Sequence, residues 1–196
     1  MLLSGFLVGL LAVAGIEPPA ATERIETRHL DAQRSHAAFS VRVLWMIPID
    51  GSFGSVHGDV HIDRFRSQAR VDARIDTNAV SMRRNGVEGW VKSEEFFDVE
   101  NFPEIRFQSD SFPLSRLDTG GDLPGSLTLR GIRRPVLFAL KPATCGRPAL
   151  DCAVEANGTV RRSEFGMRTR RATLSDKVDL SLSIRMSDDT ARSAHP

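Results

Sequence analysis

The feature that most constrains this chain is an alternation of apolar and polar residues with a period of two. It is clearest in QARVDARID, residues 68–76, where every second residue is apolar and the residues between them are charged or carry an amide. Successive side chains of a β-strand point to opposite faces of a sheet, so this segment predicts a strand with one buried face. The same alternation recurs in residues 56–63 and 178–186.

Further segments are expected to be strands: residues 34–45, 104–111, 123–130, 135–141, 151–162 and 168–175. Only RRNGVEGWVKSEEFF, residues 83–97, has helical spacing, and two glycines interrupt it. Closure of a sheet removes its exposed edges. The pattern therefore predicts one mainly β domain over residues 22–187, a single antiparallel eight-stranded β-barrel with a short helical insertion.

Residues 1–21 have the order of a signal peptide. An apolar run from Leu2 to Ile16 is followed by prolines and small residues, although no Lys or Arg precedes the run. The run is shorter than the roughly 20 residues that a transmembrane helix needs. We therefore expect export rather than a membrane anchor. Residues 188–196 show no pattern, and we expect them to be disordered.

The two cysteines, Cys145 and Cys152, lie in CGRPALDC between two predicted strands. In an oxidising compartment a disulfide would staple the loop that joins these strands and contribute about 2.5 kcal/mol in the chain-entropy model. Two free thiols or a pair of metal ligands are the alternatives, although no third and fourth ligand stand nearby. The disulfide is the preferred interpretation, and together with the signal peptide it predicts a periplasmic or secreted protein.

The charge of the chain is nearly balanced. The 26 Lys and Arg residues almost cancel the 25 Asp and Glu residues, which leaves a net charge of +1. Such a balance indicates no excess of positive charge that would attract nucleic acid or an anionic membrane. Arginine pairs occur at 83–84, 133–134, 161–162 and 170–171. Each pair lies near acids or at the edge of a predicted strand, so solvated edges and turns are favoured over phosphate binding.

Few residues could carry catalysis or hold a metal. No histidine lies in a recognisable catalytic motif, and HExxH, CxxCH, a Gly-rich phosphate loop and a dinucleotide fingerprint are absent from the sequence. His57, Asp59, His61 and Asp63 alternate along one predicted strand and could bind a metal if a neighbouring strand added a ligand. Because the opposite face of that strand is apolar, a solvated face is favoured. We predict no catalytic residue and no metal site; an enzyme that uses a bound quinone or a metal is the lesser alternative.

The remaining apolar strand residues are typical of a small barrel that either fills its interior or keeps room for one apolar ligand. Five stretches resemble, in order and spacing, the YceI-like polyisoprenoid-binding proteins: DAQRSHAAFSV (31–41), GSF (51–53), FFD with FPEIRF and Ser109, LPGSLTLRGIRRPV (123–136) and RRSEFGM (161–167). The resemblance covers residues 30–186. It implies a lipocalin-like barrel that holds a long isoprenoid or similar amphiphile in a hydrophobic channel.

The cysteine pair before RRSEFGM resembles a subset of the family. Arg34 and Val43 stand where the resemblance leads us to expect histidine, so the polar end of the pocket would differ in this chain. Apolar residues on the predicted strands and beside the insertion would line the channel. These residues are Phe39, Val41, Phe53, Val60, Val71, Ile75, Trp90, Phe96, Phe97, Ile105, Phe107, Leu129, Phe138, Leu180 and Leu182. For any one of them, plain packing in a filled core is an equally good interpretation.

Arg34, Arg83 and Arg84 are candidates for a polar mouth of this channel, and Pro103, Gly131 and Gly166 are predicted turn or bulge positions. The resemblance implies an exported, non-enzymatic carrier or reservoir for a polyisoprenoid or an isoprenoid quinone, with no other cofactor. The alternative is a structural or partner-binding barrel with a filled core, associated with a membrane redox system. We expect no nucleic-acid partner and no stable membrane insertion after signal removal; a homodimer is compatible with the sequence.

Overall fold

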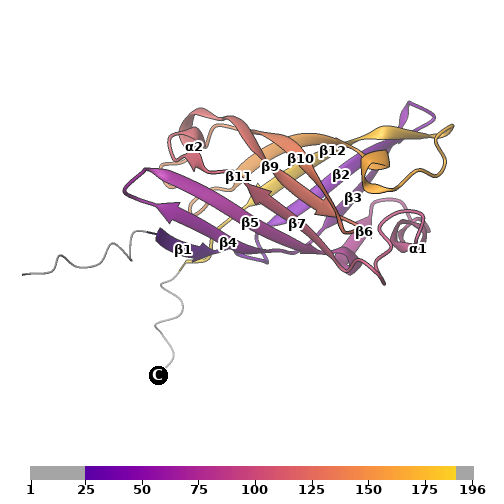
Figure 1. The fold of residues 1–196 in the computed structure, drawn as a ribbon, viewed down its shortest axis with the longest axis horizontal. Helices are drawn as coiled ribbons and strands as arrows, with labels where there is room; N and C mark the ends of the chain where they lie inside the picture. The colour runs from indigo at the N-terminus through magenta and orange to yellow at the C-terminus, as the bar shows by residue number, and fades with distance from the viewer. Residues whose placement is uncertain (1–24, 189–196) are drawn as a thin grey trace, which may run out of the picture.

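The structure is a computed structural model that describes residues 25–188, so the predicted signal peptide and all but the first residue of the predicted tail lie outside the described residues. The described residues form one curled sheet of twelve strands with two short helices (Figure 1). The strands are β1 Ile25–His29, β2 His36–Val43, β3 Ile47–Phe53, β4 Val56–Asp63, β5 Gln68–Asp76, β6 Val80–Met82, β7 Glu104–Ser109, β8 Phe112–Pro113, β9 Gly121–Leu129, β10 Ile132–Leu140, β11 Val154–Arg161 and β12 Leu174–Ile184. The helices are α1 Glu88–Lys92 and α2 Arg116–Thr119, with 3-10 turns at Thr77–Ala79 and Arg162–Phe165.

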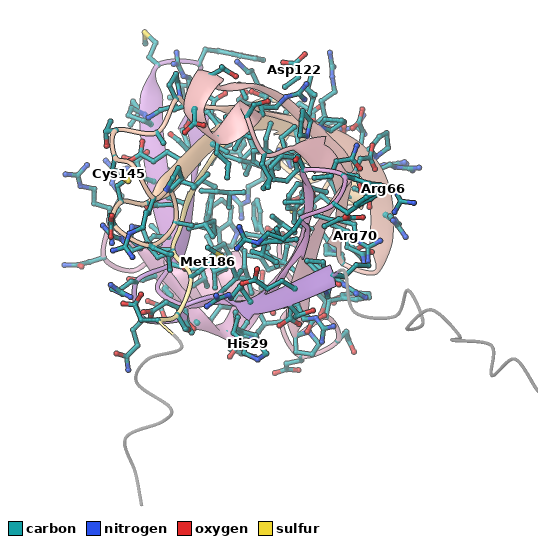
Figure 2. All side chains as sticks on the ribbon, turned by 90° about the vertical axis from the view of Figure 1, so that its left-hand side faces the viewer. His29, Arg66, Arg70, Asp122, Cys145 and Met186 are labelled. Carbon is teal, nitrogen blue, oxygen red and sulfur yellow. A yellow bond between two sulfur atoms is a disulfide. The ribbon has the colours of Figure 1, made fainter. Side chains whose placement is uncertain are left out.

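The strand order in the sheet is β1-β4-β5-β7-β9-β10-β11-β12-β2-β3-β6, with β8 beside β5, and the pairs are antiparallel. Figure 2 looks into the resulting barrel along its axis. Between β4 and β2, the N–H of Val56 donates to the carbonyl of Ser35. Leu30, just after β1, forms a bridge with Met186 beyond β12. These bonds draw the two sides of the sheet together along a seam.

A mainly β antiparallel barrel is confirmed, but its strands are twelve rather than eight. The expected strand over 168–175 is wrong: residues 168–173 form an exposed turn, and Leu174 begins the single strand β12. Alternating Arg and Thr residues resembled a strand there, yet no neighbouring strand pairs with them. Strand β3 was missed because IPIDGSF contains a proline, an aspartate and a glycine. Proline is tolerated because only the last three residues of β3 pair with β6.

The helical insertion is shorter than expected, because only Glu88–Lys92 is helical within residues 83–97. The predicted turn positions of the two glycines are confirmed. Gly131 and Gly166 have φ values of 69° and 82°, in the left-handed region that favours glycine. The corner at Phe102 is held by the buried Thr77, whose hydroxyl donates to the Phe102 carbonyl at 2.8 Å.

Aromatic rings of the core lie over glycines of neighbouring strands. Phe39 on β2 is paired with Gly51 on β3, and Phe138 on β10 with Gly158 on β11. A Cβ atom added at Gly51 would lie 2.3 Å from the Phe39 ring, and one at Gly158 would lie 2.8 Å from the Phe138 ring. The absence of a side chain at these glycines leaves the space that the two rings occupy.

The two ends of the barrel differ in what covers them (Figure 1). One end, called the α1 end, carries α1, the turn between β2 and β3, and the turn of residues 168–173. The other end, called the α2 end, carries β1, α2 and the loop of residues 141–153 between β10 and β11. The carbonyl of Leu117 in α2 accepts a hydrogen bond from Ala143 of that loop.

Candidate ligand-binding site

The interior of the barrel contains two apolar cavities in line. The cavity toward the α1 end has a volume of about 120 Å³, and the one toward the α2 end has a volume of about 80 Å³. Phe107 from β7 and Leu182 from β12 line both cavities and so lie at the boundary between them.

The structure brings the apolar residues predicted for the channel to this interior. Val60 and Val71 line the α2-end cavity, and the other predicted apolar residues line the α1-end cavity. The inward positions follow from the strand period of two, because alternate residues of each strand face the axis. Whether these residues touch a ligand stays a prediction.

The α1 end of the interior is closed by two groups of aromatic side chains. The ring centroids of Phe39 and Phe53 lie 5.8 Å apart, and the Phe97 ring lies 5.5 Å from each of them. Trp90 of α1 packs edge-on against Phe96, with centroids 4.3 Å apart. Tilted and edge-to-face contacts of this kind are favourable aromatic geometries. These rings cover the α1-end cavity.

The closing segment is tied to the neighbouring turn through Glu95. The indole Nε1–H of Trp90 donates to Glu95 Oε2 at 2.9 Å, and Nε of Arg170 donates to the same oxygen at 3.3 Å. The Arg170 guanidinium also lies over the Trp90 ring, 4.8 Å from its centroid. The hydrogen bond from Trp90, followed by that from Arg170, lowers the pKa of Glu95 below its usual value. The contacts therefore persist at pH values where an ordinary glutamate begins to protonate.

Arg162 is a buried cation in the wall of the α1-end cavity, and the sequence reasoning missed it. Its Nε, Nη1 and Nη2 atoms donate to the carbonyls of Ser175, Met167 and Leu174 at 3.0, 2.8 and 3.2 Å. No carboxylate of the described residues forms an ion pair with it, although the charge of Asp176 partly offsets the burial that lowers the Arg162 pKa. A guanidinium carries five N–H groups, so two remain beyond these three bonds.

A signal for Arg162 was present in the sequence. Ala156 and Val160 lie on the inner face of β11. Continuing the period of two beyond Val160 places Arg162 on the same face. The pair Arg161–Arg162 was interpreted as a solvated strand edge. This interpretation holds only for Arg161, which is exposed.

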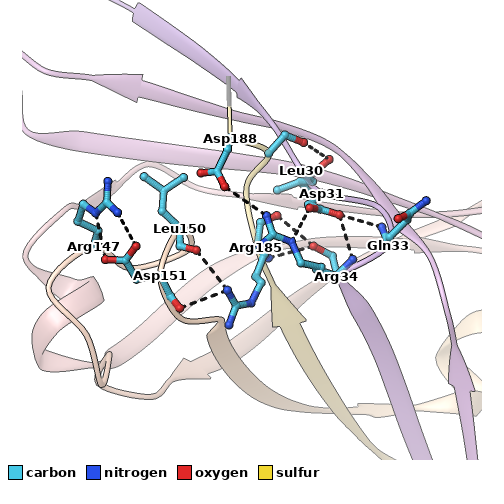
Figure 3. A network of polar contacts seen from close by, with 11 residues as sticks. Leu30, Asp31, Gln33, Arg34, Arg147, Leu150, Asp151, Arg185 and Asp188 are labelled. Atoms are coloured by element: carbon cyan, nitrogen blue, oxygen red, sulfur yellow. Dashed lines mark hydrogen bonds and ion pairs between the residues drawn. The ribbon is translucent and has the colours of Figure 1, made fainter. Parts of the chain in front are cut away.

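The three arginines proposed for a polar mouth lie outside both cavities. Arg34 is at the α2 end, where its Nε donates to Asp31 at 2.6 Å and its Nη2 lies 3.7 Å from Asp188 (Figure 3). Arg83 lies 3.8 Å from Asp50 and is mostly exposed, and Arg84 is exposed as well. None of the three lines the apolar interior.

The His and Asp residues of β4 point away from the interior. Asp59 accepts a hydrogen bond from His29 of β1 at 2.7 Å, and His61 lies 3.1 Å from the Thr27 hydroxyl. Among residues 25–188, no group of three or more His, Cys, Asp or Glu side chains is arranged to hold a metal ion.

The predicted disulfide between Cys145 and Cys152 is confirmed. It closes the loop at the α2 end, and the neighbouring Pro148 and Ala149 line the α2-end cavity. The disulfide therefore constrains the loop that covers the interior at the α2 end.

Within the described residues, no helix is long and apolar enough to cross a membrane. The sequence model of the YceI-like domain matches residues 29–186. A curated relative, UPF0312 protein YE1254 of Yersinia enterocolitica, is 27% identical over 186 residues, which cover 93% of this chain and 94% of the relative. A UPF0312 protein of Yersinia pestis is 26% identical over the same shares.

Solved structures share the fold. BcnA of Burkholderia cenocepacia superposes with a TM-score of 0.63 at 17% identity, over 81% of this chain and 99% of that one. A polyisoprenoid binding domain from Saccharophagus degradans gives a TM-score of 0.58 at 13% identity, over 81% and 97% of the two chains. The YCEI protein of Campylobacter jejuni gives 0.54 at 18% identity, over 71% and 85%. With the domain match spanning most of the barrel, the chain belongs to the YceI-like family.

Proposed function

We propose that this protein holds an elongated isoprenoid lipid, a polyisoprenoid or an isoprenoid quinone, along the axis of its barrel. The observation that carries the proposal is the pair of neighbouring apolar cavities in the barrel interior, which share Phe107 and Leu182 in their walls. Apolar area removed from water contributes roughly 25 cal/mol per Å². The polyisoprenoid binding domain with the same fold supports this choice of ligand.

Binding widens the interior in this proposal. Pockets for drug-sized ligands are usually about 300 to 1,000 Å³, whereas the larger cavity here is about 120 Å³. A long lipid therefore displaces the Phe107 and Leu182 side chains and joins the cavities. It enters at the α1 end, where side-chain contacts among aromatic rings and Glu95 hold the cover in place.

Arg162 gives the lipid a polar contact in an otherwise apolar wall. Its two remaining N–H groups suit the oxygen of a quinone, an alcohol or a phosphate head group. The protein acts as a non-enzymatic carrier or reservoir outside the cytoplasm. The disulfide supports this location, because disulfides persist in oxidising compartments.

Mass spectrometry of an organic extract of the purified protein tests the proposal. We expect an isoprenoid lipid at close to one molecule per barrel, or uptake of added polyprenol or isoprenoid quinone by a lipid-free preparation. An extract without stoichiometric lipid, together with no uptake of either compound, would overturn the proposed function.

Two tryptophan substitutions separate this function from a filled, partner-binding barrel. Leu129→Trp enlarges a residue of the cavity wall, whereas Leu137→Trp makes the same change on the exposed outer face of β10. In an expandable channel, Leu129→Trp removes lipid uptake at little cost in unfolding free energy. In a filled core the same change destabilises by about 1 to 3 kcal/mol. The outer variant should match the wild type in both measurements.

The role of Arg162 is tested by comparing two ligands on one variant. Arg162→Lys keeps a charge but loses the planar group that bonds three carbonyls. We expect it to weaken binding of an isoprenoid quinone more than binding of a hydrocarbon with the same isoprenoid chain and no head group. Equal losses for both ligands would show that Arg162 only supports the barrel end.

A further inference from the structure

The turn between β2 and β3 presents four consecutive apolar residues to solvent. Leu44, Trp45, Met46 and Ile47, called here the apolar tip, are 52%, 67%, 79% and 42% exposed. The other exposed large apolar residues of the described chain occur singly in the sequence: Ile25, Phe65 and Leu137. Contiguous exposed apolar groups usually mark a surface that contacts a partner or a membrane.

The geometry of this turn does not account for its residues. Leu44 and Trp45 have φ values of 49° and 65°, in the left-handed region that large side chains seldom adopt. Hairpin turns that need positive φ at successive residues favour Asn and Gly there. The bulky pair therefore occupies an unfavourable backbone conformation, and strained positions of this kind concentrate where a protein performs its function.

Arginines without a carboxylate partner lie beside the apolar tip. The N–H of Leu44 donates to the carbonyl of Thr173 at 2.7 Å, which places the turn of residues 168–173 against the tip. Among the described residues, Arg42, Arg168 and Arg171 form no ion pair, and all three are exposed. Trp45 and Arg171 line a common surface groove, together with Arg161 and Lys177.

We propose that the apolar tip and these three arginines dock the barrel, with its α1 end first, onto a membrane that contains anionic phospholipid. Tryptophan prefers the interface between lipid and water, and exposed arginines are attracted to acidic head groups. The net charge of +1 does not reveal this surface, because a sum over the whole chain does not show where on the barrel the charges lie.

The docked orientation faces the closed α1 end of the interior toward the bilayer. In so far as it concerns lipid exchange, this inference rests on the proposed function. An apolar ligand could then pass between the bilayer and the α1-end cavity without crossing water. The docking itself needs no bound ligand and is measured separately.

Vesicle co-sedimentation with the wild type and a Trp45→Gly variant tests the apolar part of the surface. The wild type should bind vesicles of phosphatidylglycerol and phosphatidylcholine, and Trp45→Gly should bind at least about tenfold more weakly. Glycine fits the positive φ of position 45, so the variant should be as stable as the wild type or more stable. Phe65→Ser removes an equally exposed ring at the α2 end and should bind normally.

Charge neutralisation tests the electrostatic part. Each surface arginine contributes about fivefold to binding on an acidic bilayer, so Arg42→Gln/Arg168→Gln/Arg171→Gln should bind about a hundredfold more weakly. A control with the same loss of charge at the α2 end should change little: Arg64→Gln/Arg66→Gln/Arg70→Gln. Binding of the wild type should also fall as phosphatidylglycerol is replaced by phosphatidylcholine, and as salt is added.

The inference is overturned if the wild type does not bind acidic vesicles, or if the tip and control variants bind equally. A wild-type dimer in analytical ultracentrifugation that Trp45→Gly converts to a monomer, without vesicle binding, would instead identify the tip as a subunit interface. The extracted lipid content of the same preparations keeps the two proposals apart. A barrel that carries lipid but does not dock refutes only the docking.

Discussion

The two ends of the barrel are built from different interactions. At the α2 end the cover is fixed by a disulfide, and Arg185 donates to the carbonyls of Leu150 and Asp151 at 3.2 and 3.3 Å (Figure 3). At the α1 end the cover consists of aromatic contacts and hydrogen bonds to Glu95. A covalent bond resists displacement, whereas aromatic contacts and side-chain hydrogen bonds can be exchanged. On the proposed function, the α1 end is therefore the end that we expect to open.

The largest expected effect on the unfolding free energy comes from removing a side chain that lines both interior cavities. Phe107→Ala deletes a buried ring that packs against Phe138 with centroids 5.0 Å apart, and it should reduce the unfolding free energy by about 3 to 5 kcal/mol. Because the two cavities would merge, the surviving folded protein should take up lipid faster than the wild type. Denaturant unfolding and stopped-flow uptake measure the two quantities. Slower uptake would argue against one continuous channel.

Removing the disulfide should destabilise the α2 end without affecting lipid exchange. Cys145→Ser/Cys152→Ser should reduce the unfolding free energy by about 2.5 kcal/mol, the loop-closure contribution. Lipid affinity and release rate should stay at wild-type values below the melting temperature, because the exchange takes place at the other end. A faster release from this variant would show that lipid also leaves through the α2 end.

Filling the space beside the Phe39 ring should affect both the unfolding free energy and the length of isoprenoid that the barrel can hold. Gly51→Ala adds a Cβ that would lie 2.3 Å from the Phe39 ring and 2.8 Å from Met82 Sδ. The ring must tilt toward the axis, which should cost about 1 to 3 kcal/mol and reduce the longest isoprenoid bound. Gly54→Ala is the control, because nothing lies within 4 Å of its added Cβ.

The smallest effect on stability is expected for the contacts of Glu95. Glu95→Gln weakens its bonds to Trp90 and Arg170, so lipid release should accelerate while the unfolding midpoint hardly moves. The lowered pKa of Glu95 means that the wild-type contacts are intact at neutral pH and are lost as pH falls through that lowered value. Release from the wild type should therefore accelerate only below the pH range in which an ordinary glutamate protonates, and release from the variant should lack this dependence.

Glu155→Gln provides the matched control for that experiment, because Glu155 pairs with Lys141 at 2.7 Å near the α2 end. An equal acceleration of lipid release in Glu155→Gln would show that the two ends of the barrel do not differ in how they release lipid.

The sequence predicted the barrel and its inward residues, because alternation with a period of two determines both the strand and the face. Residues 68–76 and 56–63 were assigned to strands with the bounds that the structure shows. The short strands β1, β6 and β8 could not be predicted, since their pairing depends on where distant strands lie. Arg162 was missed for a related reason: its burial depends on the carbonyls of Met167, Leu174 and Ser175, which only the folded turn brings together.

The seam of the barrel has a consequence for the order in which the chain folds. Ser35 Oγ exchanges hydrogen bonds with the backbone of Arg185, a partner 150 positions away in sequence. Contacts of such high sequence separation form late and slow the folding of β proteins. During synthesis the barrel cannot close until β12 and the residues after it have left the ribosome, so the growing chain remains open over most of its length. An unclosed chain of this kind is suited to being threaded through a membrane before it folds.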